Sequence, residues 1–248
     1  RLSTNNLKSD VLNYSPYHTR MIRPYETKDL KQCLRIFREI GWLDGKDSDK
    51  DVFEASIDGG NSLVAELDGE VEVFVGTRTG QSKYLDVDIP FSAVTAVTTS
   101  RVARQQGLAS KVTVEAISES AKNEDAMAML GMFDQGYYEK FGFGNTVNYR
   151  ISTFDPANLR VPRLTRSPKR LSKDDALAMH NCRRLRKRFH GGCNLDGYGE
   201  TKATTIEQEH AFGLGFENES GELTHFMWIK PRGEHGPYSV WFTGWETH

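Results

Sequence analysis

The first part of the chain alternates between two spacings of apolar residues. Between positions 30 and 40 the apolar residues are three or four places apart, as on one buried helix face: Leu30, Cys33, Leu34, Phe37 and Ile40. Thr27 is the expected N-terminal cap of this helix. Further helices are predicted over residues 49–57, 107–122 and 135–140.

Strands are predicted between these helices. Their expected ranges are 21–25, 62–67, 71–78, 91–98, 126–132 and 147–154. Asp68-Gly69 is a hairpin turn between the second and third strands, and Val71, Val73 and Val75 are expected on one face of the third. The resulting order, β-α-α-β-β-β-α-β-α-β, predicts a compact α/β domain with a mixed central sheet flanked by helices.

The polarity of the chain divides it into three parts. Residues 1–20 are polar and predict a flexible arm, and residues 21–155 carry the α/β pattern. Residues 156–248 form a second α+β region, which begins with a polar linker over 160–173 and continues with a helix over 174–189. Its aromatic residues are expected in a core or an interface: Phe226, Trp228, Trp241, Phe242 and Trp245.

Composition narrows the class of protein. The chain is 38% hydrophobic and 27% charged with a formal net charge of −2, so its overall charge favours neither a nucleic-acid nor a membrane partner. Three widely spaced cysteines and scattered histidines give no disulfide framework and no metal site, which fits the cytoplasm. Arg183 to Arg188 is rich in basic residues. A nucleic-acid or phosphate patch and a solvated helix face both explain it, and the solvated face is preferred.

The segment from Val97 to Ser110 carries the main chemical signal. A β-branched strand runs into a loop, and the pattern Arg104-x-x-Gly107-x-Ala109 opens the following helix. The free N–H groups and the dipole of a helix N-terminus bind anions, and a diphosphate fits there. The six-residue pattern alone is weak, but its position between a strand and an amphipathic helix strengthens the prediction.

This segment resembles the signature of the GNAT superfamily of N-acetyltransferases, Arg/Gln-x-x-Gly-x-Gly/Ala. Residues 136–144, with Tyr138, Phe141 and Gly142, resemble the Tyr-x-x-Phe-Gly element of the same superfamily. The combination is most similar to the Eis-type (enhanced intracellular survival) branch, whose members carry a GNAT domain, a second GNAT-like domain and a sterol-carrier-like domain. The close resemblance covers 21–155; the second region is expected to be a GNAT-like fold and incomplete.

The resemblance implies an acetyl-CoA site and assigns residues to it. Backbone groups of Val97, Thr98 and Thr99 would pair with the pantetheine arm. The diphosphate loop would comprise Arg104, Gln105, Gln106, Gly107, Leu108, Ala109 and Ser110. Phe133 and Asp134 would line the acetyl end. The expected cofactor is acetyl-CoA as co-substrate, with no metal.

Tyr138 is the implied general acid, because it stands three residues before Phe141 as in the family pattern. A tyrosine hydroxyl can donate a proton to a departing thiolate. Tyr137 is the competing candidate, and packing of both rings in the core is the alternative to a chemical role.

The resemblance predicts transfer of an acetyl group to a primary amine: a small polyamine, an aminoglycoside-like cation or a protein amine. A non-catalytic acyl-CoA-binding sensor or scaffold is the alternative. The identity of the general base stays open, because in the Eis branch this base is the C-terminal carboxylate of the third domain. Three alternatives stay open. Asp134 is the base, the carboxylate of His248 is the base, or the chain is a fragment of a longer protein. The aromatic second region favours a homo-oligomer.

Overall fold

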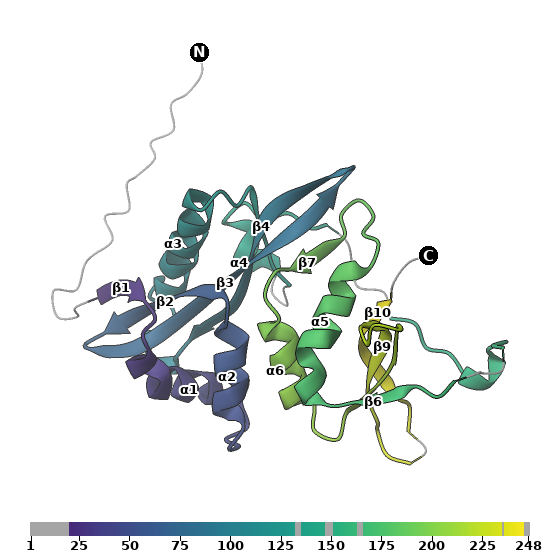
Figure 1. The fold of residues 1–248 in the computed structure, drawn as a ribbon. Helices are drawn as coiled ribbons and strands as arrows, with labels where there is room; N and C mark the ends of the chain where they lie inside the picture. Colours follow the sequence, from purple (N-terminus) through teal and green to yellow (C-terminus); the bar gives the residue numbers. More distant parts are fainter. Residues whose placement is uncertain (1–19, 132–134, 147–150, 163–165, 235, 246–248) are drawn as a thin grey trace.

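The protein is described by a computed structural model over residues 20–131, 135–146, 151–162, 166–234 and 236–245. These residues form two sheets, each with helices packed against it (Figure 1). The first sheet is six-stranded with the order β1-β2-β3-β4-β5, and β7 pairs with β3. Its strands are β1 (Arg20–Pro24), β2 (Gly60–Leu67), β3 (Glu70–Tyr84), β4 (Val87–Thr99), β5 (Met127–Met129) and β7 (Cys193–Leu195).

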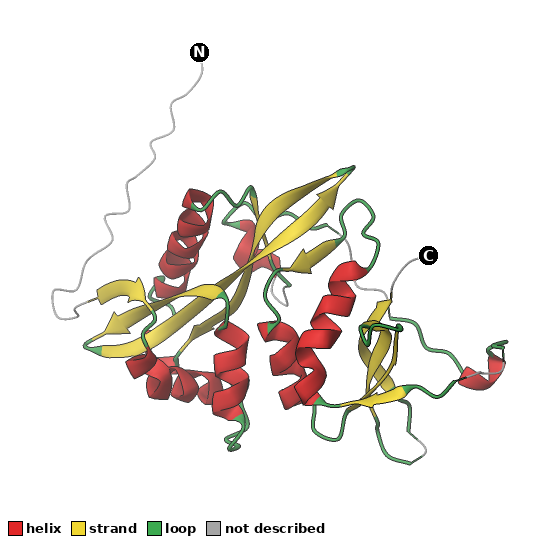
Figure 2. Ribbon diagram, in the orientation of Figure 1, coloured by secondary structure: helices red, strands yellow, loops and turns green. Residues whose placement is uncertain are grey.

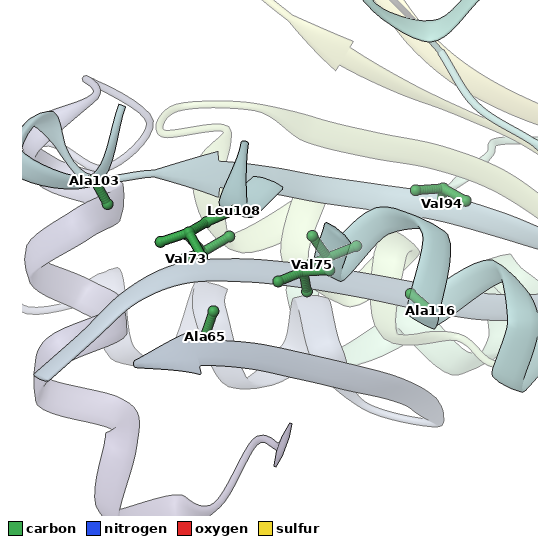
Figure 3. Close-up of a cluster of buried hydrophobic side chains, with 8 residues drawn as sticks. Ala65, Val73, Val75, Val94, Ala103, Leu108 and Ala116 are labelled. Atoms are coloured by element: carbon green, nitrogen blue, oxygen red, sulfur yellow. The ribbon is translucent and has the colours of Figure 1, made fainter. Parts of the chain in front are cut away.

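Helices cover both faces of the first sheet (Figure 2). They are α1 (Leu30–Glu39), α2 (Asp49–Ile57) and α3 (Leu108–Lys122). Helices α1 and α2 bury Ile36, Phe37 and Phe53 against one face. On the other face, α3 buries Leu108 and Val112 against the central strands in the cluster drawn in Figure 3. The mixed sheet flanked by helices, expected from the sequence, is confirmed.

The predicted shared face of Val71, Val73 and Val75 is wrong. Val73 and Val75 pack under α3, whereas Val71 packs with α1. The cause is a bulge at Glu72, where the pairing of β2 with β3 shifts register and the alternation of side chains changes phase. The Glu72 carboxylate is buried and forms an ion pair with Arg35 of α1 at 3.1 Å.

The start of α1 also differs from its predicted form. Thr27 does not cap it; a 3₁₀ turn, Thr27–Asp29, precedes the helix, and Glu26 and Asp29 form a capping box around that turn. Asp29 is buried and accepts two hydrogen bonds from the Arg23 guanidinium at 2.7 and 2.8 Å. These bonds connect β1 to the start of the first helix. They also hold the pKa of the Asp29 carboxyl below its usual range.

Two predicted strand lengths are corrected by the structure. Strands β3 and β4 extend about six and four residues further toward their shared turn than the apolar pattern indicates. The predicted strand over 147–154 is not formed in its described part, since residues 151–154 have no regular structure and Ile151 is 92% exposed. Short α4 (Gln135–Glu139) lies within its predicted range.

The second sheet repeats the plan of the first. Its order, β6-β8-β9-β10, follows the chain as β1-β2-β3-β4 does, and its neighbouring strands are all antiparallel. The elements are β6 (Lys169–Leu171), α5 (Ala176–Leu185), α6 (Gly199–Glu207), β8 (Phe212–Glu217), β9 (Leu223–Lys230) and β10 (Ser239–Trp245). A capping box of Ser172 and Asp175 precedes α5, as one precedes α1. The second region therefore shares the strand order of the first and the capped turn before its first helix; that it is a GNAT-like fold stays a prediction.

The aromatic residues of the second region divide between core and surface. Phe226 and Trp228 are buried against α5, and Phe242 stacks on Trp228 at 6.1 Å. Trp241 and Trp245 are 52% and 48% exposed. The predicted linker over 160–173 contains strand β6, which no pattern in that polar stretch indicated.

Strand β7 joins the two regions and was not predicted. It pairs with Gly80, Gln81 and Ser82 of β3, just beyond the point where β2 ends opposite Arg78. The segment is short and polar, so its sequence carries no alternation that marks a strand. Helix α6, also unpredicted, packs against α2. The second region therefore completes the sheet of the first.

We predict that Gly80→Ala weakens the junction between β3 and β7. A Cβ at Gly80 would lie 2.5 Å from the carbonyl oxygen of Asn194 and 2.7 Å from the Phe91 ring, so backbone must move. The free energy of unfolding should fall by about 1–3 kcal/mol, the usual cost of overpacking. The matched control is Gly76→Ala on the same strand, whose nearest atom would be at 3.4 Å. Equal denaturation midpoints for the two variants would contradict this account.

Candidate functional site

The outer edge of β4 is only partly paired. Strand β5 pairs with it in parallel at three positions, from Phe91 to Ala93. Beyond Ala93, no described strand adds to this edge, although β3 pairs with the other edge as far as Thr99. The predicted residues Val97, Thr98 and Thr99 all lie on this unpaired stretch. Its backbone groups are available to an extended ligand that carries amides.

A bulge in β4 lies on the same stretch. Thr95 pairs with Gly76 and Thr98 with Phe74, so Ala96 and Val97 together stand opposite the single residue between them. Ala96 has φ +52°, a left-handed conformation that costs a residue with a Cβ about 1 kcal/mol or more. Such strain is found in proteins chiefly at functional sites, and a bulge re-aims the groups beside it. Sequence reasoning missed Ala96, because alanine gives no signal of positive φ.

The loop that follows β4 brings the chain to the start of α3. Ser100 donates its N–H to the Glu72 carbonyl at 2.9 Å, and a 3₁₀ turn, Arg101–Ala103, follows. Gln105 and Gly107 both have left-handed φ, +61° and +72°. A Cβ at Gly107 would meet no atom within 4 Å, so the backbone conformation, not crowding, selects glycine there.

The N-terminus of α3 has no capping side chain and no carboxylate in its first turn. The first bond that closes the helix runs from the Lys111 N–H to the Gly107 carbonyl at 3.2 Å. The N–H groups of Leu108, Ala109 and Ser110 precede it and form no intrahelical bond. This end of the dipole is positive and suits the two negative groups of a diphosphate, so the described residues fit such a ligand.

The rest of the predicted loop agrees with this geometry. Arg104 is extended and exposed, and the Gln106 side chain donates to the Val102 carbonyl at 2.8 Å. Leu108 is buried, because it anchors the helix start in the cluster under the sheet (Figure 3). Ala109 packs beside the same cluster. The structure therefore brings the whole segment from Val97 to Ser110 into one continuous edge and loop.

The aromatic residues after β5 form their own group. The Tyr137 ring lies 4.9 Å from the Tyr138 ring and 5.4 Å from the Phe141 ring. The Lys140 ammonium lies over the face of the Tyr137 ring, 3.9 Å from its centre. The Tyr138 ring lies 6.0 Å from Phe143, which packs on the cluster beneath α3. Tyr138 is thus the tyrosine connected to the core that positions the loop.

Tyr137 has a feature that the sequence does not indicate. Its hydroxyl is buried, and no hydrogen-bond partner for it lies in the described part of the chain. An unpaired buried hydroxyl costs free energy and is uncommon. This makes Tyr137 a stronger competitor for a chemical role than the motif spacing alone suggests. The predicted residues Phe133 and Asp134 lie outside the described residues.

Two other chemistries receive no support from the described residues. No group of three or more His, Cys, Asp and Glu side chains among them is arranged to hold a metal ion. Burial raises the pKa of the Cys33 thiol to about 12, so it is not a thiolate at neutral pH. Cys182 is also buried, and the exposed Cys193 lies on β7, on the opposite side of β3 from β4.

Comparison with known proteins identifies the family. Residues 21–146, about half of the chain, match the family model of the acetyltransferase (GNAT) domain. The chain belongs to this acetyltransferase family. No curated protein sequence matches it.

Solved structures share the fold over most of the chain. A probable N-acyltransferase of Enterococcus faecalis is similar over 92% of this chain and 59% of its own, with 16% identity and a TM-score of 0.71. A GCN5-related N-acetyltransferase of Kribbella flavida is similar over 93% of this chain and 58% of its own, with 18% identity and a TM-score of 0.60. The chain thus spans less than two thirds of the length of either, and both similarities extend beyond the family-matched residues into the second region.

We predict that Ser110→Asp raises the stability of the protein and weakens its binding of a diphosphate. A carboxylate in the first turn favours the helix dipole, so the free energy of unfolding should rise by about 0.3–1 kcal/mol. The same charge should repel a bound diphosphate. Thermal unfolding with and without inorganic diphosphate measures both effects, since a ligand of the native state raises Tm.

The control is Ser118→Asp, an equal charge change at an exposed position in the second half of α3. It should keep the diphosphate-induced rise in Tm. The same rise in Ser110→Asp and Ser118→Asp would show that the anion does not bind at the start of α3.

Proposed function

We propose that the chain is an N-acetyltransferase that moves the acetyl group of acetyl-CoA to a primary amine by direct attack in a ternary complex. The acceptor class is a small polyamine, an aminoglycoside-like cation or a protein amine. We further propose that it belongs to the Eis-type branch. The order of a GNAT unit followed by a GNAT-like unit supports this assignment.

One observation carries the proposal: an unpaired strand edge leads directly into an uncapped helix N-terminus. Pantetheine is an extended chain with two amides, and the edge from Val97 to Thr99 offers complementary backbone groups. The diphosphate of CoA then meets the N–H groups from Leu108 to Ser110. Gln105 and Gln106 stand where the branch carries arginines, so the backbone donors and the dipole supply most of the attraction.

Direct attack is favoured over an acyl-enzyme intermediate. A covalent route needs an activated nucleophile beside the thioester, usually a cysteine thiolate. The high pKa of Cys33 and the burial of Cys182 remove two candidates, and Cys193 lies across β3 from the β4 edge. The amine therefore attacks the thioester carbonyl itself, the C–S bond breaks, and CoA leaves as a thiolate that must gain a proton.

Tyr138 is the proposed donor of that proton. The thiol of CoA has a pKa of about 8.5 if it resembles cysteine, so the departing thiolate takes up a proton at neutral pH, and a nearby donor can assist its departure. A tyrosine hydroxyl within hydrogen-bond reach supplies this help. The link from Tyr138 through Phe143 to the core under α3 supports this choice, and the unpaired hydroxyl of Tyr137 supports the competitor.

The attacking amine also needs a base. An alkyl ammonium has a pKa of about 10.4, so most of it is protonated at neutral pH. Both candidate bases within the chain, Asp134 and the carboxylate of His248, lie outside the described residues. A chain that binds acetyl-CoA but transfers nothing to any amine would instead be an acyl-CoA-binding sensor or scaffold.

We predict that Gly107→Trp abolishes binding of acetyl-CoA while the protein remains folded. Gly107 is exposed with nothing near its Cβ position, so a large ring is tolerated sterically but covers the helix start. Its positive φ adds strain of about 1–2 kcal/mol. The matched control is Gly221→Trp, another glycine with φ +79° and open space around it, in a turn of the second sheet. Unchanged calorimetric affinity in Gly107→Trp would exclude this site.

We predict that Tyr138→Phe lowers kcat by about 100-fold, the typical contribution of a general acid, with acetyl-CoA affinity little changed. Tyr137→Phe should leave kcat near the wild-type value. Its stability should not fall, because the lost hydroxyl has no partner among the described residues. Single-turnover acetylation of an accepted amine measures the step. A slow Tyr137→Phe with a normal Tyr138→Phe would exchange the two roles, and normal rates in both would remove the acid.

A further inference from the structure

The tip of the hairpin between β3 and β4 exposes large apolar side chains, at the opposite end of β4 from Val97, Thr98 and Thr99. Tyr84, Leu85 and Val87 are 51%, 66% and 57% exposed. The last turn of α5 and the segment after it lie against this tip and expose Leu185 and Phe189, at 59% and 72%. We call residues 83–88 and 184–190 together the tip surface.

Main-chain bonds to the two glycines that directly follow residue 190 hold the two segments of the tip surface together. Gly191 donates its N–H to the Lys83 carbonyl at 2.7 Å, and Lys83 donates its N–H to the Gly192 carbonyl at 2.8 Å. The Tyr84 and His190 rings meet at 5.2 Å. These bonds fix the loop against the hairpin, so the exposed side chains form one preformed surface. Figure 1 shows the hairpin projecting beyond the body of the sheet.

A hollow of about 500 Å³ lies within this surface and is strongly basic. Its nine lining residues include five cations and one carboxylate: Lys83, Leu85, Asp86, Arg184, Arg186, Lys187, Arg188, Phe189 and His190. The whole chain has a formal net charge of −2. The positive charge is therefore concentrated at this surface, although the net charge of the chain is slightly negative. The expectation of no membrane partner rested on the net charge and did not consider this local concentration.

The cations divide into those that hold the surface together and those that face outward. Arg188 is only 17% exposed and donates to the Gln81 carbonyl at 3.0 Å and to Asp88 at 2.9 Å, so it is structural. Arg184 and Lys187 are exposed, and the carboxylate nearest to Arg184, that of Asp196, is 3.9 Å away. Their charged groups can reach a ligand outside the protein.

We propose that the tip surface docks on an anionic phospholipid membrane. Aliphatic side chains at a projecting tip can enter the boundary between headgroups and acyl chains, while the adjacent cations meet lipid phosphates. The contact is peripheral, since none of the described helices has the length and apolar character to cross a bilayer. This inference does not depend on acetyl transfer.

The same surface is less suited to single-stranded nucleic acid. Base stacking needs an open aromatic face. The Lys187 ammonium lies 5.4 Å from the centre of the Phe189 ring, and Tyr84 packs edge-on against His190. The other apolar groups, Leu85, Val87 and Leu185, are aliphatic and offer no ring for stacking. Aliphatic groups beside cations match a lipid surface better than a row of bases.

Vesicle co-sedimentation tests the proposal with the full chain. We expect binding to phosphatidylcholine vesicles that contain about one third phosphatidylglycerol, and little binding to phosphatidylcholine alone. About 1 M NaCl should release the protein, because the Debye length then falls to about 3 Å. The double variant Arg184→Glu/Lys187→Glu should lower the partition coefficient by at least about 30-fold, at the usual strength per surface charge.

Matched controls separate the tip surface from general effects. Lys31→Glu/Lys50→Glu makes the same charge change at exposed positions of α1 and α2 and should reduce binding far less. Leu85→Ser/Phe189→Ser should lower partitioning by about tenfold or more, from lost apolar burial. Leu159→Ser/Val161→Ser, at residues 51% and 74% exposed elsewhere, should not.

Two results would overturn the proposal. One is binding to anionic vesicles that the tip variants and their controls retain equally. The other is absence of vesicle binding, with or without binding of a short single-stranded RNA that Arg184→Glu/Lys187→Glu abolishes. Every substituted residue is exposed, so we expect each variant to fold. Circular dichroism and thermal unfolding of each variant check this.

Discussion

Strand β3 is the element on which the rest of the structure depends. Its fifteen residues pair with β4 along one edge, and with β2 and then β7 along the other. Its apolar residues are buried on both faces, because α3 packs on one side of the sheet and α1 on the other. The bulges at Glu72 and opposite Val75 set which residues face each helix. One strand thus fixes the register of the candidate site on β4 and the attachment of the second unit.

The candidate site follows from what β5 does not cover. A longer fifth strand would continue the parallel ladder and close the edge of β4 beyond Ala93. None of the other described strands pairs with this edge, and the strained residue Ala96 lies within it, supported by its packing near Phe74 and α1. The loop from Ser100 to Gly107 then turns the chain so that the uncapped start of α3 follows the same edge. An extended ligand with an anionic group in its middle meets both features in order.

Much of this arrangement could be predicted from the sequence. The spacing of Leu30 to Ile40 gave α1, and Arg104-x-x-Gly107-x-Ala109 located the start of α3 to within one residue. Bulges could not be predicted, because Glu72 and Ala96 have no residue type that demands them. Strand β7 was missed because pairing with β3, not its own composition, makes it a strand. Tyr138 came from a motif, whereas the buried, unpaired hydroxyl of Tyr137 depends on tertiary packing that spacing does not report.

Strand β7 also bears on how such proteins diversify. The family-matched stretch ends at residue 146, yet the sheet it forms includes residues 193–195. A unit that borrows a strand from its neighbour cannot be moved by itself into another gene without leaving open the β3 edge at Gly80 to Ser82. Open edges recruit foreign strands and promote aggregation. A relative that dispensed with the second unit would therefore need a replacement for this one short strand, such as a charged edge residue, a proline or a covering loop.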